Sequence, residues 1–139
     1  MQRTTREGGS ATVELIAATP LLVLIALVVI ALGRLADARL LVGDTAHQAA
    51  RAASLAHTAG EADTEARKVV GAALNGNGPS CRAHHLALSH AGLRPGTQVR
   101  ARLSCTVAVG DLIGSGFVPG TTTITGTSVS PVDTFRSQP

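Results

Sequence analysis

The stretch that decides the fold runs from Gly8 to Leu32 and reads GGSATVELIAATPLLVLIALVVIAL. Between Leu15 and Leu32 it carries no charge, and Thr19 supplies its only hydroxyl group. About 18 residues in an α-helix rise roughly 27 Å, which is just enough to cross a bilayer core. A buried helix of a small soluble domain would need a polar face, and this segment has none. The sequence therefore predicts a transmembrane helix over residues 15–32.

Two residues distinguish this segment from a plain anchor. Glu14 borders the apolar run, where a carboxylate is costly unless it stays at the interface or finds a partner, although the first helical turn favours an anion. Pro20 removes a backbone donor and crowds the carbonyl of Ile16, so we expect a kink. Neighbouring helices make such a kink tolerable in a bilayer. The pair fits either an interfacial charge with a tolerated kink or a helix that packs among others.

The residues at the start of the chain also carry a family resemblance. A short basic leader, Gly9, four further residues, Glu14 and an unbroken apolar helix resemble a type IV prepilin. More narrowly, GSATVELIAATPLLVLIALVVIALGRL resembles the TadE-like family of tight-adherence (Flp) pilus assembly proteins. The resemblance covers roughly Gly8 to Ala56, with a faint echo in SVSPVDTF near the end.

This resemblance implies a processing site and an assembly residue. A membrane-embedded prepilin peptidase would cut after Gly9, remove a leader of residues 1–9 and leave Ser10 as the new N-terminus. Glu14 would pair with the N-terminal amine of a neighbouring subunit. The implied partners are other pilin or pseudopilin subunits, the peptidase and the pilus assembly platform. The family's major pilins are shorter and carry a Tyr after the Glu, whereas Leu15 stands here, so the resemblance implies a minor pilin or pseudopilin.

The expected location is the cytoplasmic (inner) membrane, crossed once, with the N-terminus cytoplasmic and the C-terminal domain extracytoplasmic. Arg3 and Arg6 suit a cytoplasmic leader, but Arg34 follows the apolar run closely, so charge alone does not fix the orientation. A competing interpretation is a secretory signal peptide that is cleaved after Ala38. Against it, the apolar run exceeds the usual length of about 7–15 residues.

The helical pattern continues beyond the apolar run and predicts one long helix over about residues 10–57. Small apolar residues recur there at three- and four-residue spacing and form an alanine-rich seam. This seam fits close packing on a partner helix or on the protein's own domain, and the sequence favours neither. The residues of the seam are Leu35, Ala38, Val42, Ala46, Ala49, Ala53 and Ala56.

The rest of the chain, residues 58–139, predicts a small extracytoplasmic domain, and the fold class is α+β with an antiparallel sheet. A short helix is expected at about 63–74, with Asp63 or Thr64 as its cap. The sequence RPGT at 94–97 predicts a type II turn. A loop is expected at 110–120 and a tail at 130–139. Ile124 and Val129 have opposite parity, so a bulge near Gly126 would be needed to turn both inward. The predicted strands are about 84–89, 99–109 and 121–129.

Cys81 and Cys105 are the only cysteines. In an exported domain with a small core they predict a disulfide, which would contribute about 3.5 kcal/mol by the chain-entropy estimate. Two alternatives use the same residues. Cys81 and Cys105 could bind a metal with His84 and His85, but the spacing lacks a paired Cys-x-x-Cys. A thiol nucleophile with a histidine base is the other, and no orienting acid is evident.

Composition narrows the remaining functions. The net charge is only +3 and the sole aromatic residues are Phe117 and Phe135, which does not suit nucleic-acid binding. The carboxylates show no pairing for acid–base chemistry, so we expect neither an enzyme nor a cofactor or metal. The leading hypothesis is a structural role in pilus assembly. The alternatives are a signal-anchored envelope-binding module, for example through the loop that contains Phe117, and a small secreted domain released after Ala38.

Overall fold

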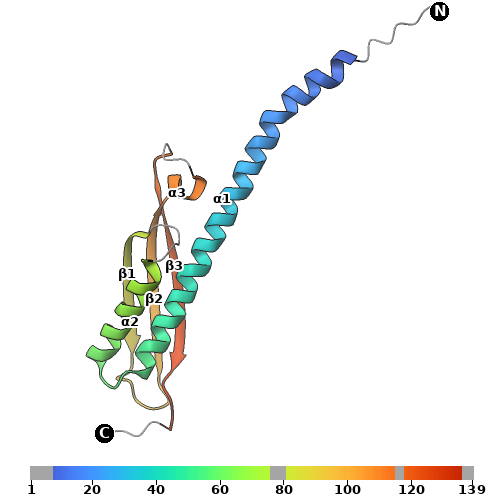
Figure 1. The fold of residues 1–139 in the computed structure, drawn as a ribbon. Helices are drawn as coiled ribbons and strands as arrows, with labels where there is room; N and C mark the ends of the chain where they lie inside the picture. The colour runs from blue at the N-terminus through green and yellow to red at the C-terminus, as the bar shows by residue number, and fades with distance from the viewer. Residues whose placement is uncertain (1–7, 76–80, 115–117, 136–139) are drawn as a thin grey trace, which may run out of the picture.

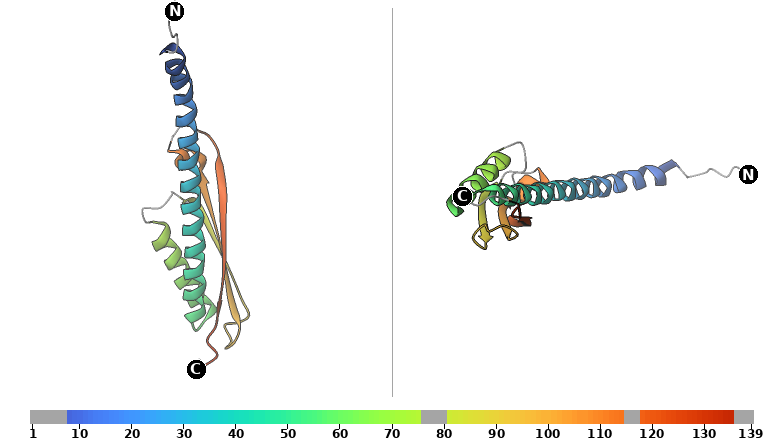
Figure 2. Two further views of the ribbon diagram at one scale, coloured as in Figure 1. Left: turned by 90° about the vertical axis from the view of Figure 1, so that its right-hand side faces the viewer. Right: turned by 90° about the horizontal axis from the view of Figure 1, so that it is seen from below.

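A long helix packs by its second half on a three-stranded antiparallel sheet, which confirms the predicted α+β class. The computed structural model describes residues 8–75, 81–114 and 118–135, with side chains from residue 13 onward. The two helices α1 and α2 and the sheet form an elongated head, from which the start of α1 projects (Figures 1 and 2). The elements are α1 (Gly8–Leu55), α2 (Ala59–Leu74), β1 (Cys81–His90), β2 (Gln98–Ala108), α3 (Val109–Ile113) and β3 (Thr121–Pro131).

The helix α1 is unbroken over 48 residues, about 72 Å at the standard helical rise. It continues through Pro20, and Figure 1 shows that it curves along its length. We call residues 13–32 the stem and the described residues from Leu35 onward the head. The first fully buried side chain of α1 is Ala38, so the head begins about where the apolar run ends.

The alanine-rich seam of α1 packs inside the protein's own head. Six of its seven residues are buried against β2, β3 and α2, and Leu35 is half-buried; together they join one core with the apolar side chains of the sheet. Small side chains let the helix approach the sheet closely. Of the two partners that the sequence left open for the seam, the structure shows the protein's own domain. The buried apolar residues of α1 are Ala38, Val42, Ala46, Ala49, Ala50 and Ala53.

The sheet has the order β1-β2-β3, with both pairs antiparallel and the helices on one face. The central strand β2 alternates as the sequence predicts. Val99, Leu103 and Val107 are buried, whereas Arg100 and Arg102 are exposed on the opposite face. This opposite face, which we call the open face, carries polar side chains from all three strands, among them Arg100 and Arg102.

The strand β3 has no bulge near Gly126, so Ile124 and Val129 do not both turn inward. The β2–β3 register runs without a shift from the pair Gln98–Pro131 to the pair Ala108–Thr121. As a result, Ile124 is buried and Val129 lies on the open face, 38% exposed. Gly126 instead marks the place where the helix crosses the strand: a Cβ there would lie 2.7 Å from the carbonyl oxygen of Val42. The helix backbone fills the space that a side chain at this position would need.

The helix α2 begins at Ala59, four residues before the predicted start. Its cap is Thr58, whose Oγ1 accepts a hydrogen bond from the backbone N–H of Glu61 at 3.2 Å. The Glu61 carboxylate in turn accepts from the backbone N–H of His57 at 2.8 Å. The pair resembles a capping box, except that the Glu61 carboxylate binds the N–H of the residue before the cap. The sequence signal for it, a Thr followed three residues later by a Glu, precedes Asp63, which lies inside the helix.

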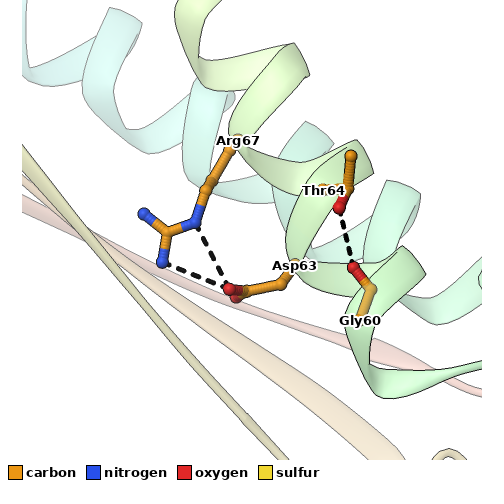
Figure 3. A network of polar contacts seen from close by, with 4 residues as sticks. All are labelled: Gly60, Asp63, Thr64 and Arg67. Atoms are coloured by element: carbon orange, nitrogen blue, oxygen red, sulfur yellow. Dashed lines mark hydrogen bonds and ion pairs between the residues drawn. The ribbon is translucent and has the colours of Figure 1, made fainter.

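Side chains on the exposed surface of α2 bond to one another along the helix (Figure 3). Arg67 Nη2 lies 3.2 Å from Asp63 Oδ2, one turn earlier. Thr64 donates its hydroxyl to the carbonyl of Gly60 at 2.8 Å. Both contacts are exposed, and the ion pair stabilises the helix by only about 0.3–0.5 kcal/mol. The opposite side of α2 packs on α1 through Ala62, Ala66 and Val70.

The end of the sheet is longer than predicted. Residues 130 and 131 belong to β3, and Val132 is buried, 1% exposed, where the sequence predicted a tail. Val132 donates its N–H to the carbonyl of Thr97 at 2.8 Å, so it extends the β2–β3 pairing. The predicted type II turn is confirmed beside it, because Thr97 N–H donates to Arg94 O at 3.0 Å and Gly96 has a φ of +77°.

The predicted loop at 110–120 contains the short helix α3, which follows β2 directly. It ends at Gly114, whose φ of +74° is the left-handed conformation that glycine adopts readily. Leu112 of this helix is buried in the core. Phe117, which the sequence suggested as part of a binding loop, lies outside the described residues.

A disulfide joins Cys81 at the start of β1 to Cys105 in β2, across 24 residues of sequence. Their Cα atoms are 5.5 Å apart. Because both sulfurs are used in this bond, neither thiol is left to act as a nucleophile or a metal ligand. His84 and His85 are exposed on β1, and the part of the chain that the structure describes holds no group of three potential metal ligands.

Candidate assembly site on the N-terminal helix

The stem is an apolar helix against which no large part of the described head packs. Every Val, Leu and Ile between Val13 and Leu32 is at least 49% exposed. Among the described residues, α1 is the one helix long and apolar enough to cross a membrane, and none of its most apolar window is buried in the head. Exposure of so many large apolar side chains to water is unfavourable, so this surface requires lipid or other helices.

Glu14 lies at the outer end of the stem. Its side chain is exposed, and it makes no hydrogen bond or ion pair with any described residue. Gly9 and Ser10, the predicted processing site, lie in the first turns of α1, although their side chains fall outside the described part of the chain. The pairing of Glu14 with another subunit's amine stays a prediction, and no described residue competes for this carboxylate.

The stem carries a hollow around Pro20. Because Pro20 has no N–H, the carbonyl of Ile16 loses its usual helical donor. One position earlier, the hydroxyl of Thr19 donates to the carbonyl of Leu15 at 2.8 Å, a type of bond that bends helices slightly. A shallow apolar depression of about 670 Å³ opens on this side of the helix. Its lining residues are Ile16, Thr19, Pro20, Val23, Leu24 and Leu27.

The depression and Glu14 lie on different sides of the stem. At about 100° per residue, Glu14 is rotated by roughly 150° from the centre of the depression. One neighbouring helix cannot fill the depression and meet Glu14 on the opposite side. In a bilayer, the Ile16 carbonyl costs several kcal/mol if nothing satisfies it, which favours a second chain on that side. Glu14 and the depression are therefore two separate features on opposite sides of the stem.

The junction between stem and head is fixed by Arg34, a residue to which the sequence assigned no contact. Its guanidinium donates to the backbone carbonyl of Asp111 in α3 at 3.1 Å. It also lies against Gly114, where a Cβ would stand 3.0 Å from Arg34 Nη1. The Asp111 side chain meets Arg82 at 3.8 Å, in an exposed ion pair. No local pattern points to this contact, because Arg34 and Asp111 are 77 residues apart.

Further polar contacts join α1 to β3 along the head. Ser54 Oγ lies 3.1 Å from Ser130 Oγ inside the core. About two helical turns earlier, His47 Nδ1 lies 3.1 Å from Ser128 Oγ at the surface. These contacts and the close passage at Gly126 hold the second half of α1 in one register on the sheet. Because α1 is continuous, the stem and the head form one rod.

This geometry defines a class of protein: an elongated α+β head that carries one exposed apolar helix long enough to cross a membrane. Within that class, the model of the family described as TadE-like protein matches residues 9–51, nearly all of α1. This match confirms the resemblance that the sequence of the helix carries. No curated protein and no solved structure matches the chain. The match suggests a role in tight-adherence pilus assembly, while the head beyond residue 51 lies outside it.

Proposed function

We propose that this chain is a minor pilin or pseudopilin of the TadE-like kind, with a structural role in building a tight-adherence (Flp) pilus or a related secretion apparatus. The observation that carries the proposal is the stem: an entirely exposed apolar helix, continuous with the packed half of α1, within the segment that matches the family model. In this role the stem first anchors the chain in the cytoplasmic membrane, with the head on the extracytoplasmic side. The stem then leaves the lipid and packs among other pilin helices.

Within such a bundle Glu14 guides assembly. A carboxylate among apolar helices is unfavourable unless a positive group neutralises it. After a prepilin peptidase cuts behind Gly9, Ser10 of a neighbouring subunit offers a free amine for this purpose. The depression at Pro20 accepts a second neighbour on the other side of the stem. The proteins of the pilus assembly platform are a further proposed partner of the chain.

The first test is the N-terminus of the protein from cells with its native processing machinery, by intact mass and N-terminal sequencing. The proposal expects a start at Ser10. A start at Met1 would overturn it and favour a signal-anchored binding module of the cell envelope, in which Glu14 has no task. A start at Arg39 would indicate a secreted domain. The structure argues against that cut, because Ala38 is buried in the middle of α1 and Arg34 holds α3.

The second test separates Glu14 from a general effect of charge on α1. Glu14→Gln is expected to insert into the membrane and to be cleaved normally, yet to reduce incorporation into the assembled structure at least about tenfold. Asp37→Asn is the matched control, since Asp37 is an exposed carboxylate on the same helix beyond the stem. Assembly of Glu14→Gln at the level of this control would contradict the role of Glu14.

A further inference from the structure

The strand β3 forms an open edge of the sheet. In the described part of the chain it pairs with β2 alone. Both backbone groups of Val132 point toward Thr97 and Gly96, on the β2 side. Because antiparallel partners alternate in this respect and the register has no shift, the even-numbered residues of β3 point their N–H and C=O groups to β2. The odd-numbered residues from Thr121 to Val129 point theirs outward.

Nothing on this edge discourages another strand from pairing with it. The five odd-numbered residues, four threonines and Val129, are all exposed. Residues 121–130 contain no charge and no proline, and the strand has no bulge. Proteins commonly guard such edges with charged side chains, prolines or bulges. The strand contains one proline, Pro131, which is its last residue and occupies an odd-numbered, outward position.

The other edge of the same sheet is guarded. In β1 the register shifts between Cys81 and Ala83, and Arg82 places a charge at the irregularity. The helix α2 lies beside this strand, where Arg67 and Val70 line a small cavity of about 190 Å³ together with the strand. One edge is thus irregular and charged, with α2 beside it, whereas β3 is regular and carries no charge.

The charges beside the open edge indicate what kind of strand would fit. On the open face, Arg102 stands directly beside Thr127, and Arg100 beside Val129. Neither arginine has a hydrogen bond or ion pair with any described residue, and the open face of the three strands carries no acidic side chain. A strand added to β3 would lie about 10 Å from β2, so its acidic side chains can extend toward these guanidinium groups across β3.

A second copy of the chain is a poor occupant. Its strands β1 and β3 contain no carboxylate to meet Arg100 and Arg102. Antiparallel pairing of β3 with another β3 would also reverse the direction of α1, which runs alongside β3 (Figure 1). If the stem anchors the chain as proposed, the two stems would then point in opposite directions and could not enter one membrane.

We propose that the open edge of β3, residues 121–129, is a β-augmentation site that binds an extended, acidic segment of a different protein. The backbone of the segment pairs with the outward N–H and C=O groups of β3. Its carboxylates, on alternate residues, face Arg100 and Arg102. This surface is separate from the stem, so its occupation and the packing of α1 can be measured independently.

The test uses the full chain in detergent micelles and a nine-residue peptide of alternating Glu and Thr, with a Lys-Thr peptide as the charge control. Amide hydrogen exchange is followed residue by residue. The Glu-Thr peptide is expected to slow exchange at Thr123, Thr125 and Thr127, which have outward N–H groups, and to leave Ile124 unchanged. Thr127→Pro removes an outward N–H that the fold does not use and is expected to weaken binding at least about tenfold. Thr127→Ala keeps the N–H and should bind within about twofold of the unsubstituted chain.

A second variant keeps the proposal testable even where the proline disturbs the strand. Arg102→Gln is expected to lower the affinity of the chain for the Glu-Thr peptide. The difference in affinity between the Glu-Thr and Lys-Thr peptides should become smaller. Equal binding of both peptides to the unsubstituted chain, or unchanged exchange at the outward amides up to the solubility of the peptide, overturns the proposal. Protection of these amides that grows with protein concentration, without peptide, identifies a second copy as the occupant and also overturns it.

Discussion

At the scale of single residues, Gly126 determines how closely the helix approaches the sheet. The backbone of α1 passes so near that a Cβ at this position would lie within 3.0 Å of both the carbonyl carbon and the oxygen of Val42. Such a contact cannot be relieved by turning a flexible side chain, because both atoms belong to the backbone. The residue that has no side chain therefore fixes the register between α1 and β3.

We predict that Gly126→Ala lowers the free energy of unfolding by about 1–3 kcal/mol, the usual range for overpacking a core. Gly71→Ala is the matched control: no atom lies within 4 Å of its added Cβ, and alanine favours the helix over glycine by about 1 kcal/mol. Chemical denaturation of the two variants in the same detergent measures both changes. Equal stability of Gly126→Ala and the unsubstituted chain would show that α1 and β3 can move apart at no cost.

Residue-scale features also show why the sequence could not supply every contact. The alternation of apolar and polar residues predicts β2, since Arg100 and Arg102 alternate with buried neighbours. The same reasoning fails for β3, where Gly126 and Ser130 are buried and Val129 is exposed. There the passing helix, which is distant in sequence, decides which side chains fit. Glu14 and Pro20 stand out from the sequence because their chemistry conflicts with an apolar helix in any fold.

At the scale of elements, Arg34 couples the stem to α3. Its guanidinium satisfies the carbonyl of Asp111 and covers Gly114, so it ties the end of the membrane-spanning part to the nearest element of the head. The sequence predicts a long helix and, separately, a small domain. It could not predict this contact, because it depends on how far α1 extends past the sheet before α3 meets it.

We predict that Arg34→Gln increases amide hydrogen exchange in residues 109–113 several-fold and leaves the buried β2 residues from Val99 to Cys105 unchanged. The reason is that a glutamine side chain is shorter and uncharged, so it loses the bond to the Asp111 carbonyl. Arg82→Gln serves as the control, since it removes the same charge from an exposed ion pair that contributes little. The same increase in both variants would assign the effect to net charge rather than to the Arg34 contact.

The start of α2 gives a second prediction at this scale. Thr58→Ala removes the side chain that caps the helix and is expected to cost about 1 kcal/mol of stability. Thr64→Ala is the comparison, because its hydroxyl bonds only to the carbonyl of Gly60 within the exposed part of the same helix. Thermal unfolding followed by circular dichroism ranks the two. If the Thr64 variant were the less stable of the two, the Thr58 cap would not be the main side-chain contribution to the stability of α2.

At the scale of the whole molecule, the head has a core of small side chains, and this core fixes the orientation of the long helix α1. Seven of the core residues in α1 and α2 are alanines, from Ala38 to Ala66, and the described part of the core contains no aromatic side chain. Small domains of this kind bury little apolar area and commonly rely on a cross-link. The disulfide between Cys81 and Cys105 supplies it, by joining the first residue of β1 to the middle of β2.

We therefore predict that replacing both cysteines by alanine lowers the free energy of unfolding by about 3.5 kcal/mol, the chain-entropy value for a loop of this length. A reductant added to the unsubstituted chain should produce a loss of the same order and should leave the double variant unaffected, which separates the bond from the change of side chains. If the double variant unfolds at the same denaturant concentration as the oxidised chain, the small core is sufficient alone. The packing of α1 against β3 would then account for the stability of the head.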